Sequence, residues 1–138
     1  MGAYPTPQPA LRTARQILAN AFPDMFVGTK VPYSLEPPIR PPIFIVVTQA
    51  GGTRPQLVTV AAHLIIQCWA GGVPDVENLS HQAMTALQNA EGTTINTDIY
   101  SVFVRGFDNI EGPVDFPDPD VTDLERWQFT GDLLVSTG

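Results

Sequence analysis

The sequence predicts an α+β fold of two layers: a mostly antiparallel sheet of about four to five strands with two helices packed on one face. Apolar residues recur at helical spacing in residues 10–22 and 75–90. The other long segments are continuously apolar or alternate with polar residues, as strands do. Hairpin-like order favours antiparallel pairing. The length of 138 residues fits one domain over residues 1–138, with residues 1–9 as an extended N-terminal segment.

The N-terminal quarter predicts one helix and one edge strand. Leu11, Ala14 and Leu18 repeat at helical spacing, with Thr6 as a possible N-cap, and Pro23 ends the helix because it lacks an N–H donor. Residues 27–33 could hold a short strand, which Pro32 confines to a sheet edge. The four prolines of residues 36–42 indicate an extended linker across the surface.

The middle of the chain predicts a long hairpin. Residues 43–49 are apolar and β-branched, which indicates a strand buried on both faces. Residues 50–56 are then expected to form the loop, with Gly51, Gly52 and Arg54 at its tip. Residues 57–70 form a strand with one core face. Its other face is mixed in polarity and is our candidate for contact between subunits: His63, Ile65, Gln67 and Trp69.

The second half predicts a helix followed by two strands. Asp75 is a suitable N-cap, and Gly92 suits the left-handed residue after the helix. Residues 99–107 and 127–135 alternate in polarity, so each is expected to be a half-buried strand.

The whole net charge of −7 lies in one segment. Residues 108–125 carry seven acidic side chains and no basic one, while the rest of the chain sums to zero. A nucleic-acid-binding protein should instead present a basic face. The segment is either a solvated loop or a loop that docks a partner or faces a lumen, and its charge and length leave both open. Its candidate residues are Asp108, Glu111, Asp115, Asp118, Asp120 and Asp123.

The sequence predicts no enzymatic site, cofactor or metal centre. Cys68 falls on the inward face of its strand, and neither His63 nor His81 has the neighbours of a catalytic triad. The acidic segment lacks the spacing of a calcium loop. Gly51-Gly52 is not followed by a Walker lysine. No signal peptide and no run long enough to cross a membrane are expected.

Several segments resemble the tail terminator, or tail completion, proteins of long-tailed bacteriophages. The N-terminal helix "ALRTARQILANAF" leads into "GTKVPYSLEPPIRPPIFIVVTQAGG", a short strand, a proline-rich crossing, an apolar strand and a Gly-Gly tip. Next comes "LIIQCWAGGVPDVENLSHQAMTALQNA", a strand ending in Trp-Ala and an alanine-rich helix. The last two strands and their acidic connection are "VFVRGFDNIEGPVDFPDPDVTDLERWQFTGDLLV". The resemblance covers about residues 10 to 136 and is a pattern of elements without a catalytic signature.

This resemblance implies a structural virion protein at the head–tail junction, assembled in the host cytoplasm. Such proteins form hexameric rings on the last ring of tail-tube protein, stop tube polymerisation and present a surface to the head–tail connector. DNA passes through the lumen without being read. The low charged fraction of 15% fits extensive contact with other proteins. The alternatives are a connector component (a stopper or neck protein), and a monomeric small-ligand-binding or enzymatic α+β domain, which would need a concave polar pocket.

Overall fold

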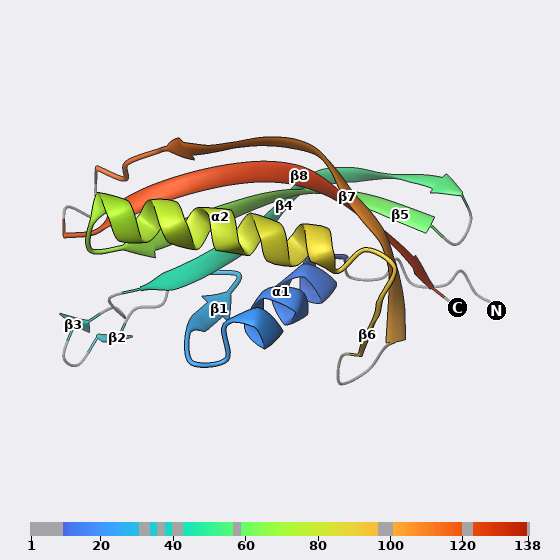
Figure 1. Ribbon diagram of the computed structural model, residues 1–138, viewed down its shortest axis with the longest axis horizontal. Helices are drawn as coiled ribbons and strands as arrows, with labels where there is room; N and C mark the ends of the chain where they lie inside the picture. Colours follow the sequence, from blue (N-terminus) through green and yellow to red (C-terminus); the bar gives the residue numbers. More distant parts are fainter. Residues whose placement is uncertain are drawn as a thin grey trace.

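The protein, described here from a computed structural model, is an α+β molecule with two helices and a six-stranded curled sheet (Figure 1). The structure describes residues 10–30, 34–35, 38–39, 43–56, 59–96, 101–119 and 123–137. The sheet order is β1-β4-β5-β8-β7-β6, and β1 runs parallel to β4 while the other pairs are antiparallel. The expected class and the mostly antiparallel pairing are therefore confirmed, but the sheet has six strands where about four to five were expected, and one pair is parallel. Its strands are β1 (Phe26–Gly28), β4 (Phe44–Gln56), β5 (Thr59–Ala70), β6 (Thr94–Asn96), β7 (Ser101–Asp115) and β8 (Glu125–Thr137).

Both helices form where the apolar spacing predicts them. Helix α1 (Ala10–Ala21) ends just before Pro23, and Thr6 lies outside the described residues. Helix α2 (Val73–Asn89) begins earlier than predicted, because Gly72 and not Asp75 is its N-cap. Pro74 fits the first turn, where a missing N–H removes no helical hydrogen bond. Neither helix of the described chain is long and apolar enough to span a membrane.

The hydrophobic core lies between the helices and one face of the sheet. The buried side chains of α1 and α2 meet alternate residues of the central strands, including Leu64 and Ile66 of β5 and Leu133 and Val135 of β8. Gly131 of β8 lies beneath the Phe107 ring, where a Cβ atom would collide with that ring. Because both helices take the same side, the described structure leaves the opposite sheet face without a helix over it (Figure 1).

Strand β4 continues through the segment predicted as a loop. Gly51 pairs with His63 and Gly52 with Ala62, so the predicted tip lies within the sheet and the prediction for residues 50–56 is wrong. A shift of register between Gln49 and Gly51 absorbs the extra residue, and Gly51 has a φ of +144°, which favours glycine. A Cβ at Gly52 would lie 2.6 Å from the carbonyl oxygen of Ala61, so glycine permits this close approach. Arg54 belongs to β4, but its side chain lies outside the described residues.

Strands β7 and β8 also extend into the segment predicted as an acidic loop. Asp108, Glu111 and Asp115 belong to β7, which leaves residues 116–124 as the connection. Three register shifts interrupt the β7–β8 ladder, and Asn109 and Gly112 adopt positive φ angles of 55° and 97° within them. Strand β6 pairs only with Ser101–Phe103, so Pro113 sits on a free edge where its missing donor is tolerated. Proline and charge therefore mark a bulged edge strand here, where sequence reasoning expected a loop.

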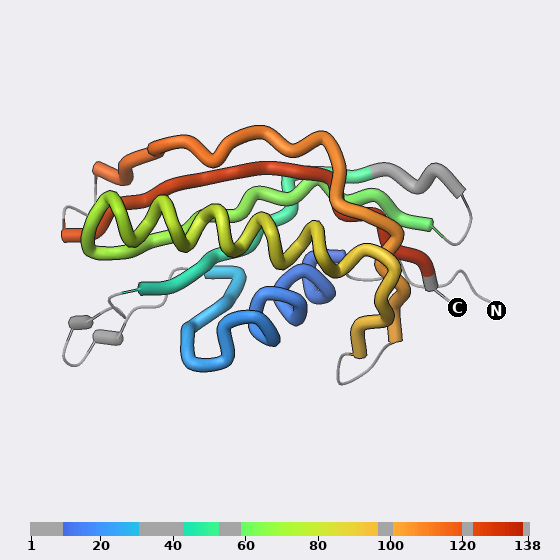
Figure 2. Tube along the Cα trace, viewed as in Figure 1, coloured from blue at the N-terminus to red at the C-terminus, as the bar shows by residue number. Residues whose placement is uncertain are grey.

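The remaining elements are short. Strand β1 occupies an edge, as predicted for residues 27–33, but it covers Phe26–Gly28, and residues 31–33 lie outside the described part. Strands β2 (Ser34–Leu35) and β3 (Pro38–Ile39) form a separate two-stranded antiparallel sheet, so part of the predicted extended linker of residues 36–42 is a strand. Sequence reasoning did not predict β6, toward which β7 bends past the end of α2 (Figure 2).

Candidate interaction surface

The sheet face that points away from both helices, here called the open face, is the candidate functional surface. Its central residues come from β5 and β8, and the register places His63 opposite Asp132, Ile65 opposite Thr130 and Gln67 opposite Gln128. All six are half-buried by one another. Gln67 Nε2 donates a hydrogen bond of 3.3 Å to Gln128 Oε1. The central part of this face is therefore a row of polar and apolar side chains along two neighbouring strands, and its role in subunit contact stays a prediction.

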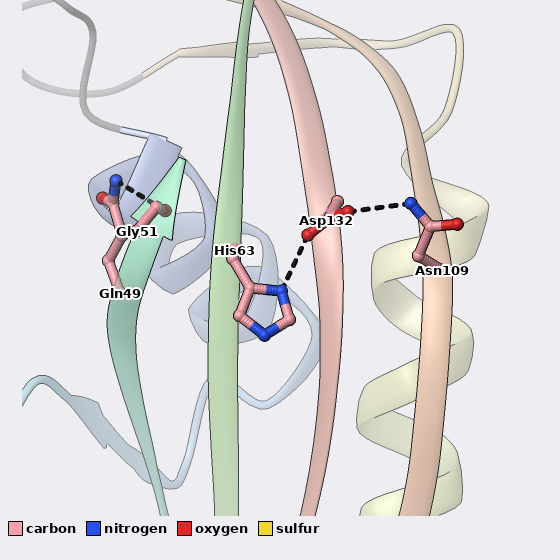
Figure 3. Close-up of polar contacts among 5 residues, drawn as sticks. All are labelled: Gln49, Gly51, His63, Asn109 and Asp132. Atoms are coloured by element: carbon pink, nitrogen blue, oxygen red, sulfur yellow. Dashed lines mark hydrogen bonds and ion pairs between the residues drawn. The ribbon is translucent and has the colours of Figure 1, made fainter. Parts of the chain in front are cut away.

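A hydrogen-bonded chain crosses three strands of the open face. His63 Nδ1 on β5 lies 2.8 Å from Asp132 Oδ1 on β8, and Asn109 Nδ2 on β7 donates to Asp132 Oδ2 at 2.8 Å (Figure 3). Gly51, opposite His63, accepts a hydrogen bond of 3.3 Å from Gln49 (Figure 3). The two predicted tip glycines thus lie in the β4 ladder, with Gly51 beside this network.

Asp132 is the charged centre of this chain. The hydrogen bond from Asn109 lowers the pKa of Asp132, and the His63 hydrogen bond and charge add to this effect, while slight burial opposes it. Asn109 reaches the carboxylate because it occupies a left-handed conformation in the bulge between Asp108 and Glu111. Asparagine tolerates that conformation better than most residues. The bulge therefore directs the Asn109 side chain toward Asp132, and the β7–β8 pairing is interrupted there.

We expect Asp132 to make the free energy of unfolding depend on pH. Its lowered folded-state pKa contributes stability that is fully present above the ordinary aspartate pKa and is lost as the pH falls through the lowered value. The free energy of unfolding of the wild type should exceed that of Asp132→Asn at neutral pH, and the difference should shrink in acid. Urea unfolding of both proteins at several pH values measures this.

Asn109→Gly is the matched control for this prediction, because glycine keeps the positive φ and removes only the amide donor. It should raise the Asp132 pKa toward its ordinary value, as followed by carboxyl NMR titration. A difference between wild type and Asp132→Asn that does not change with pH would contradict the assignment.

Trp69 does not belong to the open surface, contrary to the sequence prediction. Its side chain is 1% exposed and stacks on Phe44 with ring centroids 5.2 Å apart. The Arg126 guanidinium lies 5.1 Å from the centroid of the Trp69 ring and covers it. Together with Val46 and Leu124, these side chains form a second apolar cluster at one end of the open face.

Arg126 clamps the acidic connection to the sheet. Its Nε donates to the carbonyl oxygen of Phe116 at 2.6 Å, and its guanidinium lies 4.7 Å from the centroid of the Phe116 ring. The same group reaches Pro117 O at 3.4 Å and Asp118 Oδ2 at 3.7 Å. Sandwiched between Trp69 and Phe116, the cation keeps favourable contacts with two rings and orders residues 116–118.

The acidic candidates are spread along β7 and its connection to β8. Asp108, Glu111 and Asp115 are exposed on the strand, Asp118 contacts Arg126, and Asp123 is exposed just before β8. Asp120 lies outside the described residues. Asp108 is opposite Asp132 in the ladder, so the negative charge reaches from the connection into the open face.

Cys68 and His63 are the thiol and the imidazole on β5. Burial raises the pKa of the Cys68 thiol to about 12, although Ser80 hydrogen-bonds it, so the nucleophilic thiolate is disfavoured. His63 is oriented by Asp132 as a general base would be, but no hydroxyl or thiol of the described chain donates to it. No group of three metal-binding side chains occurs among the described residues.

The groove between the helices has no carboxylate, lysine or arginine among its described lining residues. A hollow of about 710 Å³ is lined mainly by amide, hydroxyl and alanine side chains of α1 and α2, with one imidazole: Ala21, Phe22, His81, Gln82, Thr85, Ala86 and Asn89.

No family model and no curated protein matches this chain. A proposal for its function therefore rests on the surface geometry and on the resemblance in its segments.

Sequence reasoning missed four residues that shape this surface: Asn109, Arg126, Phe116 and Asp132. Asp132 and Arg126 do alternate with the core residues of their strand, which signals an outward position. Their partners, however, are 8 to 69 positions away in sequence, so only the tertiary structure could identify them.

Proposed function

We propose that this protein is a structural virion protein that forms a ring on the head-proximal end of a phage tail tube. The ring stops tube polymerisation and joins the tail to the head–tail connector. Its partners are further copies of the chain in a ring of six, the tail-tube protein and a connector protein. DNA passes through its lumen without sequence-specific contact.

The observation that carries this proposal is the open face of the sheet. On this face β5 and β8 carry half-buried apolar and polar side chains, and no helix of the described chain covers them. Such a face suits a ring in which neighbouring subunits pack against it or in which it lines the lumen. The reason is that a sheet usually buries its apolar side chains against another layer. The hydrogen bonds from His63 and Asn109 to Asp132 and from Gln67 to Gln128 tie neighbouring strands of this face together.

The electrostatics support a passage for DNA more than a grip on it. The strand edge and connection next to the open face carry Asp108, Glu111, Asp115 and Asp118, while the nearby Arg126 is held by carbonyl groups and aromatic rings. Carboxylates repel phosphates, so DNA would slide past such a surface without counterion release to hold it. The order of elements also fits the resemblance to tail terminators.

The test is the native mass of the purified protein, with negative-stain images of the same fraction. We expect a six-fold ring with an open centre, at six times the chain mass of 15.0 kDa. If the free chain is single, it should form the ring when mixed with tail-tube protein of the same virus. A chain that stays single in both conditions would overturn the proposal. Binding to connector protein but not to tubes would identify a stopper or neck component instead.

A further inference from the structure

An apolar groove lies beside the C-terminal end of α1. Its volume is about 380 Å³, within the range of about 300–1,000 Å³ found for sites that enclose small groups. Phe22, Met25 and Ile43 are half-buried and pack against the core, so their outer sides form the lining. The residues that line it are Ala21, Phe22, Pro23, Asp24, Met25 and Ile43. The groove belongs to the helix layer of the molecule.

An apolar tip projects from the other layer. Val114 and Phe116 are 53% and 46% exposed, two large hydrophobic side chains separated by one residue at the end of β7. Val114 pairs with Gln128, whose side chain lies on the open face. Arg126 holds the Phe116 ring and carbonyl oxygen, which limits the rotamer entropy that the ring would lose on binding.

The segments that carry these two surfaces have opposite net charges. Residues 108–118 around the tip carry four carboxylates and no basic side chain. Residues 10–30 around the groove carry three basic side chains, Arg12, Arg15 and Lys30, against the single carboxylate of Asp24. Asp24 lines the groove itself, Arg15 Nε donates to the carbonyl oxygen of Val27 at 2.9 Å, and Lys30 is exposed after β1. The segment that contains the groove therefore has a net positive charge, opposite in sign to that of the acidic tip.

We propose that a second copy of this chain inserts its Val114–Phe116 tip into the groove formed by Phe22, Met25 and Ile43. The tip and the groove lie on opposite layers of one molecule, so each copy uses one surface to give and the other to receive. Such a head-to-tail contact builds a ring when the rotation between neighbouring copies closes on itself. This inference rests on the proposed ring and specifies the contact that builds it.

The test uses one variant for each surface. Val114→Ser with Phe116→Ser removes the tip, and Ala21→Trp fills the groove from an exposed position. Val114→Ser alone keeps the contact between Arg126 and Phe116, so it removes apolar area without loosening the connection. Val73→Ser, which removes a 47% exposed side chain at the start of α2, is the matched control.

We expect each surface variant to need at least about tenfold more protein than the wild type to assemble. The control should assemble as the wild type does. A mixture of the tip variant and the groove variant retains one intact contact, so native mass spectrometry should show pairs of chains and nothing larger.

Two outcomes overturn the inference and are distinguishable. If the wild type forms rings and the tip variant forms them at the same concentration, this contact is wrong and the ring stands. If the wild type stays single both alone and on tube ends, the ring and this contact fall together.

Discussion

Replacing Trp69 with alanine should lower the free energy of unfolding by about 3–5 kcal/mol, the usual cost of truncating a buried aromatic side chain. Trp69 is 1% exposed, and its removal would leave a cavity between Phe44 and the Arg126 guanidinium. The urea midpoint of Trp69→Ala compared with the wild type measures this loss.

The same experiment separates a core residue from a contact between subunits. Ile65→Ala is the matched comparison, because Ile65 lies on the same side of β5 and stays half-exposed on the open face. We expect a clearly smaller loss of stability for Ile65→Ala. A Trp69→Ala protein with unchanged stability but lost assembly would restore the original assignment of Trp69 to a subunit contact.

Arg126→Ala should release the acidic connection from the sheet. The variant loses charged hydrogen bonds to two carbonyl oxygens and the contacts with the Trp69 and Phe116 rings. We expect a loss of about 2–3 kcal/mol, the scale of a charged hydrogen bond with a cation–π contact. Amide exchange at Phe116, whose N–H donates to the Arg126 carbonyl, should accelerate.

Arg126→Lys is the control for charge alone. Lysine keeps the cation but lacks the planar fork that bonds the carbonyl groups and stacks on the rings. We therefore expect its exchange rates to fall between those of the wild type and Arg126→Ala. If Arg126→Lys matches the wild type, the cation and not the fork orders the connection. Unchanged exchange at Phe116 in Arg126→Ala would exclude the clamp altogether.

The clamp also links the stability of the connection to the proposed assembly. Arg126 lies outside the tip and the groove, yet it positions the Phe116 ring. Arg126→Ala should accordingly weaken ring formation without altering either apolar surface. This effect would be one of preorganisation, because a mobile tip loses more entropy when it binds.

The sequence by itself determined the class of fold and most of its core. Apolar spacing located α1 and α2, and alternation in residues 57–70 and 127–135 separated core side chains from those of the open face. These patterns are local, because a helix or a half-buried strand repeats its environment every few residues. His63, Ile65 and Gln67 could be placed on the open face for that reason.

Only the tertiary structure decided how far the strands extend and which side chains meet. Prolines, glycines and carboxylates favour loops, yet pairing with β5 and β8 satisfies the backbone of Gly51 and Asp108 within strands. Trp69 became a core residue because Arg126 and Phe44, both distant in sequence, cover it. The contact of His63 with Asp132 and Asn109 likewise depends on the registers of three strands, which no local pattern contains.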